Sequence, residues 1–229
     1  QRIIEKTPIS SFILWGPSGS GKTSIAKAIS KQFSLDNFEL SAVLSGVKDL
    51  RIIFEKAENN YFKGQQTILF IDEIHRFNKA QQDSFLPYIE RGVVTLIGAT
   101  TENPSFSIIS PLLSRCQVIK LEKLSKKDLF ALKLKAEKFL GFNLPITNDA
   151  CETLFKMVDG DARYFLNLIE EISSLGIKHK KLEPKDLKEL FNMKFAEYDK
   201  NNDQHFNLIS ALHKSLRASD TDASLYWLA

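Results

Sequence analysis

Short apolar stretches alternate with amphipathic ones along the first half of the chain. Five stretches have the length and bounds of strands, and they cover residues 11–15, 38–43, 66–71, 93–99 and 117–121; of these, 11–15 and 93–99 have the pattern of buried strands. Between the second and the third, apolar residues from Val47 to Tyr61 recur at steps of three and four, which predicts an amphipathic helix that ends at Gly64. Similar patterns predict helices after residue 21 and over Lys79 to Arg91. Strands that alternate with helices predict the α/β class, with a parallel sheet covered by helices on both faces.

The pattern changes near Lys123, beyond which no apolar run of strand length occurs. Three helical patterns follow, and they extend over Leu129–Phe139, Ala150–Val158 and Ala162–Ile172. Asn148 and Asp161 stand where the second and third of these helices would begin. We therefore expect an α/β domain over residues 1–122, a small helical domain over 123–195, and the start of a further helical region over 196–229.

Composition and charge narrow the class of protein. The 229 residues are 43% hydrophobic and 26% charged, which is typical of a globular protein and excludes a disordered chain, a coiled coil or a collagen. The net charge of +3 is too balanced to indicate nucleic-acid binding by itself. No apolar run approaches the ~20 residues of a membrane span. The chain begins at Gln1 without a methionine, so we expect it to be a piece of a longer protein.

The cysteines and histidines argue against metal and disulfide chemistry. Cys116 and Cys151 are far apart in apolar surroundings, which predicts buried thiols in a reducing cytoplasm rather than a disulfide scaffold. The four histidines have no metal-ligand spacing, so we expect no zinc site.

A glycine-rich segment joins the first strand to the helix after it. It matches the phosphate-loop pattern G-x-x-x-x-G-K-S/T at every position. Its residues are Gly16, Pro17, Ser18, Gly19, Ser20, Gly21, Lys22 and Thr23, followed by Ser24. The glycines let backbone N–H groups turn inward around phosphate oxygens, and the helix N-terminus adds its positive end. Lys22 is expected to reach the β- and γ-phosphates and the Thr23 hydroxyl to ligate Mg²⁺, so the segment predicts binding of ATP with Mg²⁺.

Two carboxylates follow the third strand. Residues 68–71 are apolar and lead directly to Asp72 and Glu73, which a parallel sheet places at the edge where ligands bind. Asp72 is expected to hold Mg²⁺ through water, and Glu73 to orient and deprotonate the attacking water as the catalytic base. An apolar run before two acids is a weak signal alone. Together with the phosphate loop it predicts a hydrolase rather than a small-molecule kinase.

Polar residues at the end of the fourth strand are candidates for sensing the γ-phosphate. A strand beside the phosphate-loop strand would place Thr101 opposite the γ-phosphate, with Thr100 and Asn103 as the fallback choices. A turn that caps the next helix explains the same residues equally well.

Two arginines are candidates for contacting the nucleotide. Arg115, in Ser114-Arg115-Cys116, follows a helix and precedes the last strand, and it is either a functional group or a structural arginine paired with a nearby acid. Arg163 lies in the first turn of a predicted helix, where a positive charge opposes the helix dipole, and this misfit hints at another use.

Together these motifs resemble those of AAA+ ATPases of the clamp-loader and branch-migration group. The triplet around Arg115 resembles the arginine-finger motif of clamp loaders, and Gly160-Asp161-Ala162-Arg163 resembles their sensor 2. A closer similarity is to the RarA/MgsA family of replication-associated recombination proteins, whose eukaryotic relative is the Werner-helicase-interacting ATPase. It rests on residues 71–83, 96–106 and 208–215, with further support in 40–51 and 220–229. The resemblance covers nearly all of the chain from residue 11, except around 123–157 and 174–195.

The resemblance implies a fold and an activity. The fold would be a five-stranded sheet of order 5-1-4-3-2 in an AAA+ domain, then a helical lid, then a truncated oligomerisation region. The activity would be that of a DNA-dependent ATPase at stalled or damaged replication forks, working as a homotetramer. Its partners would be DNA forks, gaps or ends and single-stranded-DNA-binding protein, in the cytoplasm at the nucleoid. Arg115 would act in trans on a neighbour's ATP, and Arg163 would act from the lid on the γ-phosphate of its own subunit.

The resemblance also implies what this chain lacks. The family's N-terminal segment, which helps to form the adenine pocket, and its tetramerisation region are not in the sequence. Ser18 and Ser20 stand where many members have proline and threonine. We therefore expect a largely monomeric chain with low ATPase activity and an incomplete adenine pocket.

Other function classes stay open. One is a clamp-loader subunit or branch-migration motor, and another is a nucleotide-dependent scaffold with little hydrolysis, against which Glu73 argues. For DNA contact the first candidates are Arg76 and Lys79, which follow the two acids at a place where residues of clamp-loader relatives face a central channel. The second candidate is the basic run Lys178–Lys181, for which a solvated surface is the simpler explanation.

Overall fold

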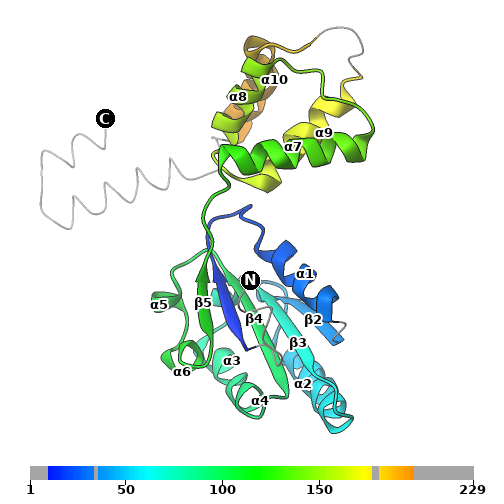
Figure 1. Cartoon of the computed structure of the whole chain (residues 1–229). Helices are drawn as coiled ribbons and strands as arrows, with labels where there is room; N and C mark the ends of the chain where they lie inside the picture. The colour runs from blue at the N-terminus through cyan, green and yellow to red at the C-terminus, as the bar shows by residue number, and fades with distance from the viewer. Residues whose placement is uncertain (1–9, 34–35, 177–180, 199–229) are drawn as a thin grey trace, which may run out of the picture. The chain divides into compact units, whose positions relative to one another are not determined.

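A computed structural model describes residues 10–33, 36–176 and 181–198 (Figure 1). Several sequence expectations lie outside these residues: the helical region beyond residue 198, with its stretches 208–215 and 220–229, and most of the basic run Lys178–Lys181. The described chain forms two compact units. One comprises the chain up to Asn143 together with Phe155–Ser174, and the other comprises Leu144–Leu154 and the stretch from Leu175 onward.

The first unit is built on a five-stranded parallel sheet. Its strands are β1 (Phe12–Trp15), β2 (Asp36–Ser41), β3 (Thr67–Asp72), β4 (Val94–Thr100) and β5 (Gln117–Lys120). Their order is β2-β3-β4-β1-β5, and every neighbouring pair is parallel, which confirms the predicted order 5-1-4-3-2. In this register Trp15 of β1 lies opposite Thr100 of β4, so the phosphate loop begins where β4 ends. Gly16 continues the pairing, because its N–H donates to the Thr100 carbonyl at 3.2 Å.

The sheet has an apolar core on each face, as the alternation of side chains along a strand requires. On one face, Phe12 and Leu14 of β1 pack with Ala26 and Ile29 of the helix that follows the phosphate loop. On the other face, Ile13 belongs to a larger cluster that includes apolar residues of the helix between β2 and β3. Figure 1 shows α1 and α2 on either side of the strands. This layered α/β arrangement confirms the predicted fold class.

Helices fill most of the described chain between and after the strands. They are α1 (Lys22–Phe33), α2 (Val47–Phe62), the 3-10 turn η1 (Ile74–Arg76), α3 (Lys79–Asp83), α4 (Leu86–Glu90), α5 (Pro104–Ser107), α6 (Ser110–Leu113), α7 (Lys126–Leu140), α8 (Asn148–Val158), α9 (Ala162–Ser174) and α10 (Pro184–Tyr198). The end of α2 agrees with its prediction, since Gly64 adopts a positive φ of 74° and its N–H donates to the Tyr61 carbonyl. Among the described residues, no helix is long and apolar enough to cross a bilayer.

Two predicted elements differ from the structure. The helix expected over Lys79 to Arg91 is broken into α3 and α4, because Pro87 in the first turn of α4 has no N–H to donate to the preceding turn. The second strand was expected over 38–43 and spans Asp36–Ser41 instead. The chain turns after Ser41, whose carbonyl accepts from the N–H groups of Leu44 and Ser45.

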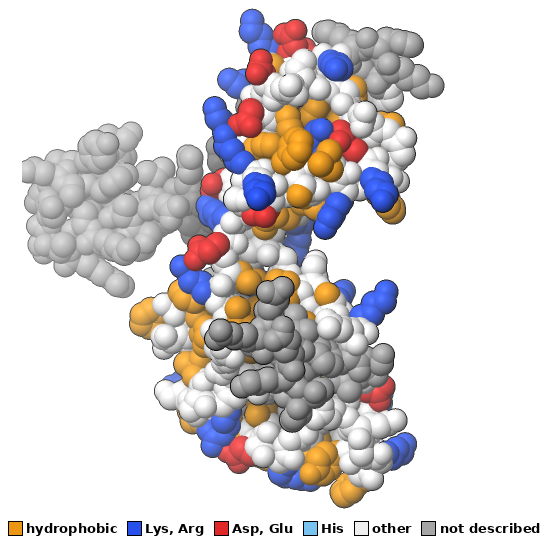
Figure 2. Space-filling model, viewed as in Figure 1, with side chains coloured by type: hydrophobic (Ala, Val, Ile, Leu, Met, Phe, Trp, Pro, Cys, Tyr) orange, Lys and Arg blue, Asp and Glu red, His pale blue; other side chains and the backbone are white. Residues whose placement is uncertain are grey.

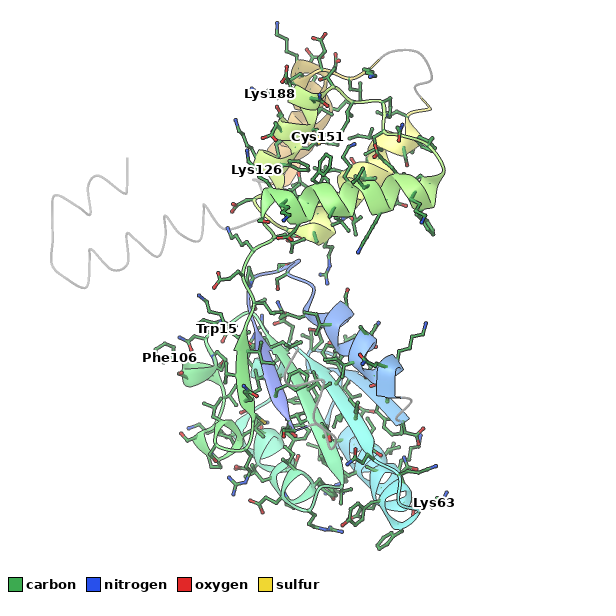
Figure 3. All side chains as sticks on the ribbon, viewed as in Figure 1. Trp15, Lys63, Phe106, Lys126, Cys151 and Lys188 are labelled. Atoms are coloured by element: carbon green, nitrogen blue, oxygen red, sulfur yellow. The ribbon has the colours of Figure 1, made fainter. Side chains whose placement is uncertain are left out.

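Helices α7 and α9 of the first unit pack together. Asp161 caps α9, since its Oδ1 accepts from the Tyr164 N–H at 2.9 Å. Not every apolar residue of these helices is buried: Phe130, Leu134 and Phe139 of α7 are exposed. Figure 2 shows hydrophobic and basic (Lys or Arg) side chains together on the face that α7 presents to the viewer. On α5, Phe106 is exposed and points away from the sheet (Figure 3).

In the second unit, a short parallel bridge joins Ile146 to Leu182. The Thr147 N–H donates to the Leu182 carbonyl at 3.0 Å, and the Leu182 N–H to the Pro145 carbonyl at 2.7 Å. Leu187 and Phe191 of α10 are buried.

Candidate active site

The carboxyl ends of β1, β3 and β4 meet at a pocket of about 310 Å³ in the first unit. Its walls come from the phosphate loop, from Asp72 and Glu73 after β3, from Thr101 after β4, and from the first turn of α9. A parallel sheet places ligand sites at this edge. The structure thus brings together residues that are far apart in the sequence.

The phosphate loop adopts the backbone that its glycines permit. Gly19 and Gly21 have positive φ values of 67° and 90°, which favour glycine. A Cβ at Gly16 would lie 2.5 Å from the Leu121 carbonyl, so this position has room only for glycine. Helix α1 begins at Lys22, and the Ile25 N–H donates to the Gly21 carbonyl at 2.9 Å.

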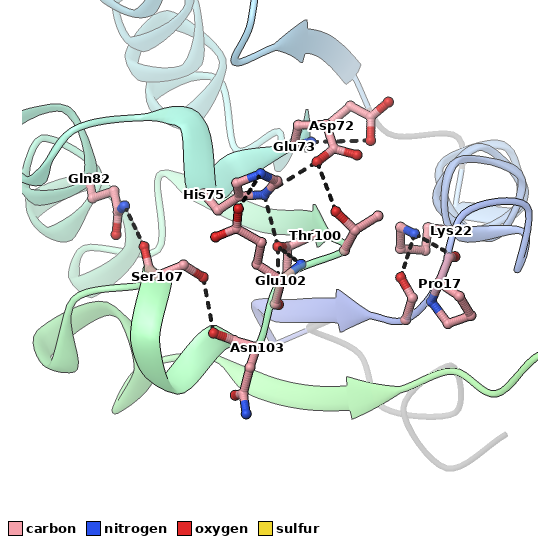
Figure 4. Close-up of polar contacts among 12 residues, drawn as sticks. Pro17, Lys22, Asp72, Glu73, His75, Gln82, Thr100, Glu102, Asn103 and Ser107 are labelled. Atoms are coloured by element: carbon pink, nitrogen blue, oxygen red, sulfur yellow. Dashed lines mark hydrogen bonds and ion pairs between the residues drawn. The ribbon is translucent and has the colours of Figure 1, made fainter. Parts of the chain in front are cut away.

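Lys22 is buried within its own loop. Its Nζ donates to the carbonyl oxygens of Gly16 at 2.8 Å and Pro17 at 2.9 Å (Figure 4). Burial lowers the pKa of Lys22 below its ordinary value, and the nearby carboxylates of Glu73 and Asp72 act against that shift. The positive charge of Lys22 at the pocket favours the binding of an anion there.

The loop fits a phosphate ligand. Among the described residues, the buried Ser20 Oγ is without a hydrogen-bond partner, although a hydroxyl can both donate and accept. A buried polar atom without a partner is costly, but Ser20 is not among the residues that line the pocket, so the fit to phosphate rests on Lys22 and on the glycine backbone of the loop. Thr23 and Asp72 both line the pocket, and their hydroxyl and carboxylate oxygens are of the kind that Mg²⁺ prefers. The residues present therefore fit ATP with Mg²⁺.

Glu73 stands at the end of β3 in a left-handed conformation, with φ 53° and ψ 44°. A non-glycine residue adopts this backbone at a cost, which is often met at functional sites. Its Oε2 accepts from the Thr101 hydroxyl at 3.4 Å and lies 3.3 Å from His75 Nδ1 (Figure 4). The carboxylate thereby faces the pocket from the side opposite α1.

The three candidates after β4 take different places. Thr101 lines the pocket beside Glu73, as a γ-phosphate sensor would. Thr100 is buried behind it, and its hydroxyl contacts His75 Nδ1 at 3.0 Å. Asn103 caps α5, because its Oδ1 accepts from the Ser105 N–H at 3.1 Å.

Of the two candidate arginines, only Arg163 lies at the pocket. Arg163 lines the pocket from the first turn of α9, whose Ala162 N–H donates to the Gly19 carbonyl at 3.2 Å. Arg115 is not among the residues that line the pocket. It lies between α6 and β5 and forms an ion pair with Glu90 of α4, to which its Nε donates at 2.6 Å. Arg115 is therefore paired with a nearby acid, as expected for an arginine with a structural role.

Sequence reasoning missed three residues at the site. Leu166 and Asn167 of α9 line the pocket, about one turn from the start of the helix. His75 stands two positions after Glu73 and contacts it through the η1 turn. A histidine just beyond a pair of acids at a strand end was the one available signal.

Two family models match the chain. The model described as "ATPase family associated with various cellular activities (AAA)" matches residues 12–123, and the "AAA C-terminal domain" model matches residues 140–217. Together they cover the phosphate loop, both acids after β3 and α9.

Relatives with assigned names are similar over the whole chain. Replication-associated recombination protein A is 44% identical in Escherichia coli K12 and 45% identical in Coxiella burnetii, each over 100% of this chain and 53% of the relative. The ATPase WRNIP1 of Dictyostelium discoideum is 41% identical over 100% of this chain and 29% of its own length. The chain thus spans about half the length of the bacterial relatives it matches.

A solved structure is similar as well. The RuvB Holliday junction branch migration motor of Thermotoga maritima superposes with a TM-score of 0.67 and 26% identity, over 81% of this chain and 62% of that one. Fold, motifs and relatives agree, and the chain belongs to the AAA family of ATPases, in the group of replication-associated recombination protein A and WRNIP1.

Proposed function

We propose that the chain is the ATP-hydrolysing part of a DNA-dependent ATPase of replication-fork maintenance and recombination, which works as a homo-oligomer on DNA. The observation that carries the proposal is that Lys22, Asp72, Glu73 and Thr101 all line one pocket. The names of the most similar relatives support the replication and recombination context.

In this proposal the pocket binds ATP with its phosphates against the loop. Lys22 leaves the carbonyl oxygens of its own loop and reaches the β- and γ-phosphates. The N–H groups of the loop donate to phosphate oxygens. Thr23 and Asp72 would hold Mg²⁺, which when bound neutralises charge on those oxygens. Ser18, Gly19 and Ser24 line the same pocket.

Hydrolysis then needs a base and groups that sense the γ-phosphate. Glu73 accepts the proton of the water whose oxygen attacks the γ-phosphorus, and ADP leaves. Thr101 holds Glu73 and faces the γ-phosphate. Arg163 reaches the γ-phosphate of its own subunit from α9, and Arg115 reaches that of a neighbouring subunit.

The DNA-related part rests on the relatives rather than on the pocket. We propose DNA forks, gaps or ends and single-stranded-DNA-binding protein as partners, a homotetramer for the longer protein, and a place at the nucleoid in the cytoplasm. Arg76 and Lys79, both exposed after β3, are the proposed DNA contacts. Such contacts with phosphates weaken as salt rises.

The test is ATP hydrolysis with and without DNA. We expect hydrolysis that forked or gapped DNA stimulates more than intact duplex does, and that Lys22→Ala abolishes together with nucleotide binding. Arg76→Ala with Lys79→Ala should remove the DNA stimulation and leave the rate without DNA unchanged. Nucleotide binding without hydrolysis under all these conditions would instead indicate a scaffold.

A second candidate function is a branch-migration motor, which the similarity to the RuvB motor favours. The higher identity and full coverage of the recombination relatives favour the first proposal. Directional migration of a four-way DNA junction driven by ATP would support the second.

A further inference from the structure

His75 lies at the start of the η1 turn, directly behind Glu73. Its side chain is only 4% exposed, whereas histidine is intermediate among the residue types in how often it is buried. The turn begins because Glu73 takes a left-handed backbone, and the Arg76 N–H then donates to the Glu73 carbonyl at 2.8 Å. This geometry folds the imidazole back against the carboxylate two residues earlier.

Both ring nitrogens of His75 face polar groups (Figure 4). Nδ1 lies 3.0 Å from the Thr100 hydroxyl and 3.3 Å from Glu73 Oε2. Nε2 lies 3.5 Å from Glu102 Oε1. Thr100 is itself fixed, because its Oγ1 accepts from the Glu102 N–H at 3.1 Å. The ring therefore connects Glu73, after β3, to the end of β4.

The position of Glu73 depends on a balance between its neighbours. Lys22 and Glu73 attract each other across the pocket, since the Glu73 charge acts on the pKa of Lys22. On the other side, the carboxylate contacts the buried His75 and the exposed Thr101. The two contacts are similar in length, 3.3 Å to His75 and 3.4 Å to Thr101, but the His75 ring is held in place by burial and by Thr100, whereas Thr101 is exposed. His75 is thus the rigid neighbour of Glu73 on the side away from Lys22.

We propose that His75 is a positioning residue for hydrolysis: it fixes the Glu73 carboxylate at the pocket and ties it to Thr100 and Glu102 at the end of β4. His75 itself touches no substrate in this role. The proposal rests on the proposed function, because it needs Glu73 to be the base. A general base acts only when its oxygen is placed within hydrogen-bond reach of the water.

The test compares two substitutions in the full-length oligomeric protein, which is proposed to have the complete active site, with Mg²⁺ and ATP. His75→Leu removes both nitrogens and keeps an apolar side chain of similar burial. His75→Asn keeps an amide N–H near the place of Nδ1, from which it can donate to Glu73. We expect kcat to fall on the order of 10- to 100-fold in His75→Leu, because a misplaced reacting group costs about that much, with KM nearly unchanged. His75→Asn should recover most of kcat.

A double substitution separates positioning from packing. In a Glu73→Gln background, His75→Leu should cause no further loss of the residual rate, because His75 acts through Glu73. Binding of a fluorescent ATP analogue and the melting temperature report whether each variant is folded.

Three outcomes decide the proposal. A wild-type kcat in His75→Leu overturns it, and so does an equal loss of kcat and of ATP-analogue binding in both His75 variants, since that pattern indicates packing. A loss in His75→Leu that His75→Asn restores supports it. Hydrolysis by Glu73→Gln at the wild-type rate would instead refute the proposed function itself.

Discussion

Arg115 and Glu90 form an ion pair on the surface of the α/β part, with Arg115 Nε 2.6 Å from Glu90 Oε1. Arg115 Nη1 also donates to the Pro111 carbonyl at 2.7 Å. The side chains are 36% and 49% exposed, and such exposed pairs stabilise a fold by about 0–1 kcal/mol. An arginine finger is worth roughly 10³–10⁵ in rate. The free energy needed to break the Arg115–Glu90 ion pair is therefore far smaller than the lowering of the activation barrier that Arg115 would provide at a neighbour's ATP.

The first prediction concerns Arg115→Ala in the oligomeric protein. ATP binding should be unchanged, and hydrolysis should fall by roughly 10³ or more, because the charge on the transition state is lost. The free energy of unfolding should change by less than about 1 kcal/mol, since the lost ion pair is exposed. Equilibrium binding, single-turnover hydrolysis and denaturant unfolding measure the three quantities.

Mixing variants tests whether Arg115 acts in trans. Neither Arg115→Ala nor Lys22→Ala should hydrolyse ATP alone, but their mixture should regain activity. The reason is that a mixed interface can pair an intact arginine with an intact phosphate loop. Mixtures that regain nothing would rule out the trans role, and Glu90→Gln, which leaves the arginine intact, serves as the control.

A second prediction compares two glycines of the phosphate loop. A Cβ at Gly19 would overlap the Asp161 carboxylate and lie 2.9 Å from the Ala162 nitrogen, whereas a Cβ at Gly21 meets no atom within 4 Å. Both positions have positive φ, so both alanine variants share the backbone strain. Gly19→Ala should therefore unfold at least about 2 °C below Gly21→Ala without nucleotide, which corresponds to roughly 1 kcal/mol. Equal melting temperatures would show that the contact of the loop with α9 contributes nothing.

A third prediction follows from the burial of Cys116, which raises the pKa of its thiol to about 12. The native chain should react slowly with a thiol reagent near pH 8, and both cysteines should react once it is unfolded, because the thiolate is the reactive form. The folded state retains this proton more tightly than the unfolded state, whose thiol has the ordinary value of 9.0. Its contribution to stability is thus complete below pH 9.0 and is lost as the pH rises toward about 12. Cys116→Ser should remove that alkaline loss, and an unchanged slope would contradict it.

The phosphate loop and the two acids could be predicted because each is a contiguous motif at the end of a strand. Strand patterns also gave the sheet, since a buried parallel strand is a simple apolar run. The choice between Thr100 and Thr101 was harder, because neighbouring residues at a strand end point in opposite directions. Only the structure shows that Thr100 is buried against His75 and that Thr101 faces the pocket.

Other features depend on contacts between distant segments or on a local backbone that hydropathy does not encode. The role of His75 beside Glu73 follows from the left-handed conformation of Glu73, which the sequence gives no reason to expect. Leu166 follows the apolar pattern of a core residue, yet it lines the pocket and is 41% exposed. The pairing of Arg115 with Glu90 joins two segments 25 residues apart.

Glu73→Gln is the most direct test of the central claim, that this pocket binds ATP and hydrolyses it with Glu73 as the base. The amide keeps the size of the side chain but cannot take the proton of the attacking water. The measurement is a single turnover of bound radiolabelled ATP, with binding affinity determined on the same sample. The account predicts an affinity within about twofold of the wild type and a hydrolysis rate lower by roughly 10²–10⁴. Hydrolysis at the wild-type rate by Glu73→Gln would contradict it.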